Sequence, residues 1–319
     1  MQTNRVSGLE AIERIVRSSL EFYAELFKAE NIRKNIEGLS KKLPVIELPT
    51  LDSLKRPVES LLKGLNGTVA QFSEKQKKID YHAIVNSFLP PGAELIRPQY
   101  PENSNEIQFA DLDADGRNEL VTSYKTREGI RTLILKKDDV QWYRMAEISN
   151  PEFKGMHYRN AANIAGDGRQ YLLLGLNSDL QSKMLFAYSL ADGNAKKIFG
   201  RKYNMLELLR SRSTKEPSKD TLALWNEEAP NIYDIETVCW NGVEIMQLDN
   251  KRYLADKVVP YYIRKLRQNP NDTVGWYNLA NVMAKSGNTA NAAEAVRLGL
   301  EHNPDAFLAD KFNSLKNRL

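Results

Sequence analysis

The feature that most constrains this chain is an acidic run, D-L-D-A-D-G-R-N-E-L, at residues 111–120. Carboxylates alternate at Asp111, Asp113 and Asp115, and Gly116 supplies a sharp turn that a residue with a Cβ would resist. Ca²⁺ takes roughly six to eight oxygen ligands, and alternate carboxylates converge on one point when the chain curls around it. We therefore predict a calcium loop whose ligands are Asp111, Asp113, Asp115, the main-chain carbonyl of Arg117, and Glu119.

The segments on either side of this loop are typical of strands, because residues 107–109 and 120–124 are short, apolar and β-branched or aromatic. An EF-hand is not indicated, since its twelfth position needs a bidentate glutamate and is Thr122 here. A calcium loop between strands resembles the FG-GAP or VCBS repeat of integrin-α-type β-propellers. That resemblance implies that the D-x-D-x-D-G-x-x-E residues bind calcium. The alternative is a metal-free acidic turn.

A second copy of the motif lies at residues 163–172, where Asp167 and Gly168 align with Asp115 and Gly116. Its other ligand positions are weakened to Asn163, Ala165 and Tyr171. We expect this second loop to keep the turn and to bind calcium poorly or not at all. A third, more eroded copy lies at residues 219–224.

The region over residues 90–250 is predicted to be a β domain that begins at the Pro90-Pro91-Gly92 boundary. It contains about three units of roughly fifty residues, each with a loop, an inner strand and an outer hairpin. That spacing suits propeller blades, although three are too few to close a ring. We expect an antiparallel, blade-like, incomplete propeller whose exposed edges are covered by helices.

The N-terminal region, residues 1–89, is predicted to be helical. Its first helix has an apolar stripe that weakens near residues 29–31, where a kink or break is expected, and a second helix is expected from Leu51. The stripe favours packing on itself or on the β domain; the alternative is a coiled-coil seam that joins subunits into a homo-oligomer. The stripe consists of Leu9, Ile12, Val16, Leu20, Tyr23 and Phe27.

The last region, residues 251–319, is helical and resembles the tetratricopeptide (TPR) repeat. The resemblance rests on Pro270 and Pro304, one 34-residue period apart, and on Trp276, Leu279, Ala280, Met283, Gly287, Ala292 and Val296. It implies a concave groove for a peptide or partner helix, faced by Asn278, Asn281 and Lys285. The alternative is a repeat that only packs. Because stable stacks need about three repeats, we expect this array to rest on the β domain.

The sequence thus predicts an α+β multidomain protein without a catalytic constellation. The three histidines are scattered, Cys239 is the single cysteine, and phosphate-loop and dinucleotide-binding motifs are missing. The middle region, residues 81–250, has 24 acidic and 20 basic residues, and basic clusters with interleaved aromatics, as nucleic-acid binding needs, are missing.

We therefore expect a non-enzymatic calcium-binding scaffold or protein-interaction protein. The alternatives are an enzyme of glycan or phosphodiester chemistry and membrane-surface binding through basic N-terminal helices. Neither a signal-peptide core nor an apolar stretch of about 18 residues is visible, so no transmembrane segment is expected. The expected location is cytoplasmic, or extracytoplasmic if the native start differs.

Overall fold

The computed structural model describes residues 8–38, 79–178, 183–190, 193–211 and 219–319. The chain divides into two compact units, of which the first comprises Met1–Tyr23 and Val85–Leu319 and the second Ala24–Ile84. The helix predicted from Leu51 lies outside the described residues. In the second unit the structure describes the end of helix α1 (Gly8–Gly38) and the start of α3 (Tyr81–Asn86).

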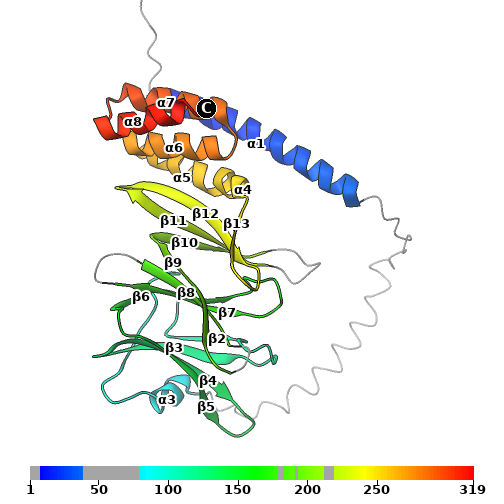
Figure 1. The fold of residues 1–319 in the computed structure, drawn as a ribbon, viewed down its shortest axis with the longest axis vertical. Helices are drawn as coiled ribbons and strands as arrows, with labels where there is room; N and C mark the ends of the chain where they lie inside the picture. Colours follow the sequence, from blue (N-terminus) through cyan, green and yellow to red (C-terminus); the bar gives the residue numbers. More distant parts are fainter. Residues whose placement is uncertain (1–7, 39–78, 179–182, 191–192, 212–218) are drawn as a thin grey trace, which may run out of the picture. The chain divides into compact units, whose positions relative to one another are not determined.

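The β region consists of three antiparallel sheets that follow one another in chain order (Figure 1). Within the described residues, no strand pairing joins one sheet to the next. The first sheet contains β1 (Glu94–Leu95), β2 (Ile107–Ala110), β3 (Glu119–Thr126), β4 (Gly129–Lys137) and β5 (Trp142–Asn150). The second contains β6 (Gly155–Ala162), β7 (Tyr171–Asn177), β8 (Lys183–Ser189) and β9 (Lys196–Tyr203). The third contains β10 (Met205–Leu209), β11 (Thr221–Ala229), β12 (Ile232–Trp240) and β13 (Ile245–Leu248).

The core lies between successive sheets. Strand β7 is apolar along almost its whole length because it is buried on both faces. Its residues Leu172 and Leu174 pack with Val121 and Ile134 of the first sheet. Its residue Leu173, on the opposite face, packs with side chains of the third sheet. The second sheet is therefore the middle layer of the β region.

Two buried polar side chains also tie the sheets together. Arg159 of β6 donates to Ser123 Oγ of β3 at 3.0 Å and to the carbonyl oxygens of Asn105 and Glu106 at 2.8 Å each. Asp220, just before β11, accepts a hydrogen bond at 3.0 Å from the backbone N–H of Asn163. These contacts fix the loops of neighbouring sheets against each other.

A helical tail follows the third sheet. It comprises α4 (Lys251–Tyr253), the π-helical turn η2 (Leu254–Val258), α5 (Val259–Gln268), α6 (Thr273–Lys285), α7 (Thr289–Glu301) and α8 (Ala306–Lys316). Asp272 caps α6 by accepting from Gly275 N at 2.9 Å. Trp276 and Phe312 are fully buried in the tail. The finer assignment to TPR repeats stays a prediction.

Helix α1 corrects three expectations. It runs without a break through residues 29–31. Its buried residues in the first unit are Ala11, Ile12, Ile15, Ser19 and Tyr23, whereas Leu20 of the predicted stripe is 66% exposed. The third correction concerns the partner of this helix, which is the helical tail and not the β domain. The Tyr23 hydroxyl forms a hydrogen bond with Ser286 Oγ at 2.6 Å, and Glu13 accepts from Arg267 at 2.7 Å.

Candidate metal centre

The acidic loop, residues 111–119, joins β2 to β3, whose paired ends are Ala110 and Glu119. Gly116 has a φ of +85°, a left-handed conformation that glycine adopts without strain. Ala114 adopts a similar φ of +63°. The short hairpin therefore has to curl tightly, which brings the alternate carboxylates to one side.

Each carboxylate of the loop uses one oxygen to accept a backbone N–H of the loop itself. Asp111 accepts from Gly116 at 3.0 Å, and Asp115 from Arg117 at 2.8 Å. The other two bonds run from Asp115 N to Asp113 at 3.4 Å and from Leu112 N to Glu119 at 2.7 Å. Every carboxylate therefore keeps one further oxygen that the backbone does not use.

The three aspartates lie close together, because one carboxylate oxygen from each of Asp111, Asp113 and Asp115 falls within 4.8 Å of the other two. Among the described residues this is the single group of three or more acidic, histidine or cysteine side chains with such spacing. The buried atoms Asp111 Oδ1 and Glu119 Oε1 lack a hydrogen-bond partner. A buried oxygen without a partner is costly, so the donor set fits a bound cation.

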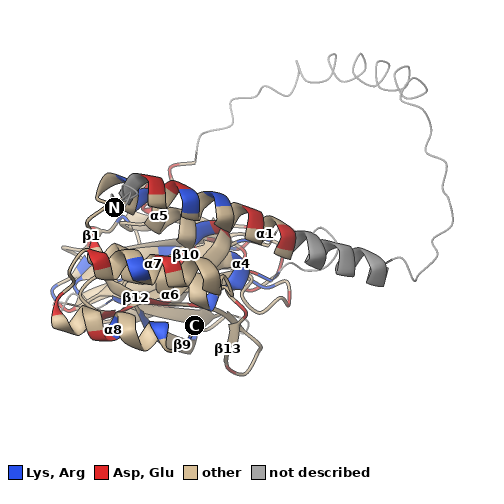
Figure 2. Cartoon of the chain, turned by 90° about the horizontal axis from the view of Figure 1, so that it is seen from above, with Lys and Arg blue, Asp and Glu red and all other residues tan. Residues whose placement is uncertain are grey.

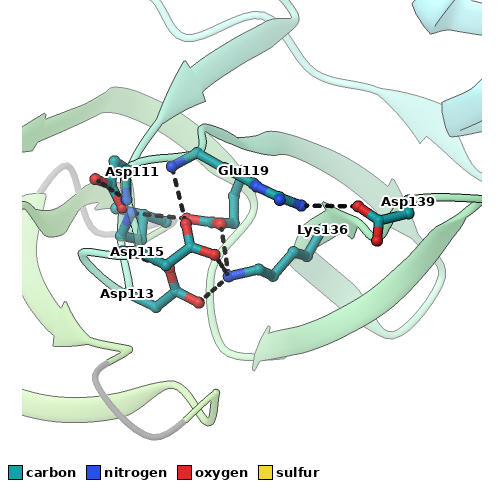
Figure 3. A network of polar contacts seen from close by, with 9 residues as sticks. Asp111, Asp113, Asp115, Glu119, Lys136 and Asp139 are labelled. Atoms are coloured by element: carbon teal, nitrogen blue, oxygen red, sulfur yellow. Dashed lines mark hydrogen bonds and ion pairs between the residues drawn. The ribbon is translucent and has the colours of Figure 1, made fainter.

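Lys136 of β4 provides a positive charge at this position that the sequence analysis did not identify (Figure 3). Its ammonium pairs with Asp113, lies 2.7 Å from Asp115 Oδ2 and lies 3.5 Å from Glu119 Oε1. Burial disfavours the charged lysine, but hydrogen bonds with Asp113 and Asp115 outweigh that effect and raise its pKa. Lys136 therefore acts as an internal counter-ion.

Glu119 is the most deeply buried of the four carboxylates, with none of its surface exposed. Burial raises the pKa of Glu119, and the hydrogen bond from Leu112 N opposes that shift. Asp115 is exposed, and its hydrogen bond with Lys136 lowers its pKa. The Arg117 side chain points to Asp139 at 3.4 Å, while a ligand role for its carbonyl stays a prediction.

The second loop keeps the turn, with Gly166 at φ +77° and Gly168 at φ +84°. Asp167 accepts from Arg169 N at 3.1 Å through one oxygen and from the Tyr171 hydroxyl at 2.8 Å through the other. The tyrosine thus occupies the oxygen that the corresponding Asp115 offers to a cation. In the third sheet, the buried Asp220 instead pairs with Arg210 at 2.9 Å.

Comparisons of the chain with protein-family models, curated proteins and solved structures gave no match. The likeness of the acidic loop to an FG-GAP repeat therefore rests on its residues and stays a prediction.

The three residues predicted to face a partner groove lie in α6, and Asn278 and Lys285 contact the chain's own β11–β12 hairpin. Asn278 is buried; its amide donates to the Asn231 carbonyl at 2.7 Å and accepts from Tyr233 N at 3.3 Å. Lys285 pairs with Asp234 at 2.5 Å. Asn281 is half-buried. The expectation that Asn278 faces an open groove is thus corrected, because the hairpin occupies its polar atoms.

The described residues also include a pair of acids at a cavity and a charged N-terminal helix. The acids Glu128 and Glu147 line one cavity, but both pair with Arg131, at 2.7 and 3.2 Å. The described part of α1 carries acidic as well as basic side chains (Figure 2). Among the described helices, none combines the length and the apolarity that crossing a membrane requires.

Proposed function

We propose that this chain is a non-enzymatic scaffold protein whose acidic loop binds calcium. One observation carries the proposal: four carboxylates each give one oxygen to a backbone N–H of the loop, and the buried second oxygen of Asp111 has no hydrogen-bond partner. The second oxygens of Asp113 and Asp115 are held by the Lys136 ammonium, a cation that a metal ion could replace. Asp111, Asp113, Asp115 and Glu119 would hold the ion. Bound calcium would neutralise these charges and fix the β2–β3 hairpin on the first sheet.

The charge balance supports a divalent ion in addition to Lys136. A single ammonium cannot neutralise Asp111, Asp113 and Asp115 together, and Glu119 adds a fourth acidic group. Calcium suits this set better than magnesium, since it accepts irregular arrangements of carboxylate and carbonyl oxygens, whereas magnesium demands near-octahedral geometry and keeps its water. When calcium binds, we expect the Lys136 ammonium to give up its contacts with Asp113 and Asp115.

The test compares thermal unfolding and calcium titration calorimetry for the wild type, Asp113→Asn and Asp139→Asn. Asp113 belongs to the cluster, whereas Asp139 is a 91% exposed carboxylate nearby and serves as the matched control. Calcium at a hundred times its dissociation constant should stabilise the protein by about 2.7 kcal/mol, a rise in Tm of roughly 5–10 °C. Asp113→Asn should abolish the rise and Asp139→Asn should keep it.

A wild type whose melting is the same in calcium and in chelator would refute the proposal. The loop would then be an acidic turn that is paired with Lys136 and does not bind a metal ion. Magnesium in place of calcium provides the selectivity control, and it should give a much smaller rise in Tm.

A further inference from the structure

A second candidate site lies far along the chain from the acidic loop, at a cavity of about 360 Å³ bordered by the second and third sheets. A volume of this size is typical of small-molecule sites. The side chains on which the argument depends are Tyr100, His157, Lys183, Glu207, Trp225 and Tyr253. We refer to this space as the aromatic cavity.

His157 reaches the aromatic cavity from a β-bulge in β6. The β6–β7 register pairs Met156 with Leu176 and Tyr158 with Gly175, so His157 is the extra residue. Bulges redirect a side chain and are common next to functional sites. Tyr100 donates its backbone N–H to the His157 carbonyl at 2.7 Å and stacks its ring on the imidazole.

The neutral imidazole presents a hydrogen-bond donor. His157 Nδ1 lies 2.8 Å from the hydroxyl of Tyr203, which is buried. Among the described residues the buried O–H has no other acceptor, and leaving it unpaired would be unfavourable, so we assign it as the donor to Nδ1. In this tautomer Nε2 carries the proton and is the remaining polar atom of the ring.

Lys183 places a positive charge in the same cavity. Its ammonium donates to the Asn204 carbonyl at 2.9 Å, and among the described residues it forms no ion pair within 4.0 Å. A lysine has three donors, so two are left over. A half-buried ammonium without an acid is unfavourable, and an anionic ligand would relieve it.

The polar groups on the opposite wall of the aromatic cavity already have hydrogen-bond partners within the protein. The Trp225 indole N–H donates to the Tyr253 hydroxyl at 3.1 Å, and that hydroxyl donates to Glu207 at 3.0 Å. Glu207 also lies 3.9 Å from the ammonium of Lys257. This chain of contacts holds the Trp225 and Tyr253 rings in place, and Glu207 disfavours a doubly charged anion such as phosphate.

We propose that the aromatic cavity binds a small aromatic carboxylate. The carboxylate would accept from the Lys183 ammonium and the His157 Nε2–H, and the ring would lie against Tyr100 and Trp225. One negative charge matches the Lys183 ammonium, which forms no ion pair with the described residues. This site is independent of the acidic loop, so it stands whether or not the chain binds calcium.

The experiment titrates the full chain with phenylacetate and indole-3-acetate, and in parallel with the corresponding neutral amides. Binding is read by saturation-transfer NMR of each probe and, for phenylacetate and its amide, also by tryptophan fluorescence, to which Trp225 contributes. We expect saturable binding of both acids. The amides should bind at least about tenfold more weakly than the acids, since they lose the charge-assisted hydrogen bond.

Two lysine variants complete the test. Lys183→Met should weaken acid binding by about tenfold or more, and Lys202→Met, an exposed lysine on β9, should leave it unchanged. Lys183→Arg keeps the charge and should retain part of the affinity, which guards against a folding defect in the methionine variant. Failure of both acids to bind by about 10 mM, equal binding of acids and amides, or full binding by Lys183→Met would each overturn the proposal.

Discussion

The ammonium of Lys136 lies 2.7 Å from Asp115 Oδ2 and so joins β4 to the acidic loop that precedes β3. The same ammonium pairs with Asp113 and approaches Glu119. An internal cation and a bound metal ion would use the same oxygens. The two therefore compete, and the energetic consequences of that competition are measurable.

Lys136→Met should make the loop depend more strongly on calcium. Without the ammonium, the carboxylates repel one another in the metal-free protein, so the free energy of unfolding in chelator should fall by about 1–3 kcal/mol. Calcium affinity should rise, because the ion no longer displaces a resident cation. Calorimetry and melting of Lys136→Met and of Lys137→Met, its exposed neighbour, check this. Weaker calcium binding by Lys136→Met would contradict the competition.

The contact with Lys136 was accessible from the sequence. Strands β3 and β4 pair Leu120 with Leu135, and continuing that register by one residue places Glu119 beside Lys136. The alternating aspartates identified the loop because their chemistry is local. The lysine belongs to the next strand, so finding it required the register of the hairpin, which depends on its two-residue turn at Arg127 and Glu128.

The antiparallel β region and the C-terminal helical region were predictable from periodicity, whereas β6 and β10 were not identified. In β6 the bulge at His157 shifts the inward-facing positions, and the buried side chains include the charged Arg159. A strand with an interrupted alternation and a buried arginine does not show the period-two pattern on which strand prediction depends. The packing of α1 on the tail was also missed, since a stripe predicts burial but not the surface that covers it.

Asn278→Ala should destabilise the protein although it removes a residue first predicted to bind a partner. The change leaves the Asn231 carbonyl and the Tyr233 N–H without their hydrogen bonds, which costs about 1–3 kcal/mol. Asn281→Ala, on the same helix and half-buried, is the control and should change the free energy of unfolding by less than about 0.5 kcal/mol. Urea unfolding measures both variants. Equal effects would mean that the contact with the hairpin adds no stability.

Gly175→Ala should disturb the packing beneath the aromatic cavity. A Cβ at residue 175 would lie 2.8 Å from Tyr158 Cβ and would collide with the Tyr203 hydroxyl. Overpacking of this kind costs about 1–3 kcal/mol. Gly155→Ala is the matched control in the same sheet, since its nearest neighbour, Asn177 Nδ2, lies 3.4 Å away. If both variants have the same free energy of unfolding in urea, the Tyr203 hydroxyl does not lie as close to β7 as in this structure.

The stability of the protein should fall on acidification in part through His157. Burial, together with the nearby Lys183 charge, lowers the pKa of His157 from 6.5 to about 4. In the unfolded chain His157 therefore takes up a proton below pH 6.5, whereas in the folded chain it stays neutral until about pH 4. The stabilisation that neutral His157 gives the folded state is complete above pH 6.5 and is lost as the pH falls from 6.5 to about 4.

His157→Gln removes the titrating group, so its deficit relative to the wild type should shrink between neutral pH and about pH 4.5. Urea unfolding of both proteins at the two pH values measures the difference. The acidic loop is the same in both proteins, so its contribution to the pH dependence of stability cancels from the comparison. A deficit that stays the same at both pH values would show that the fold does not hold His157 neutral, and would contradict the assignment of Nδ1 as the acceptor of the Tyr203 hydroxyl.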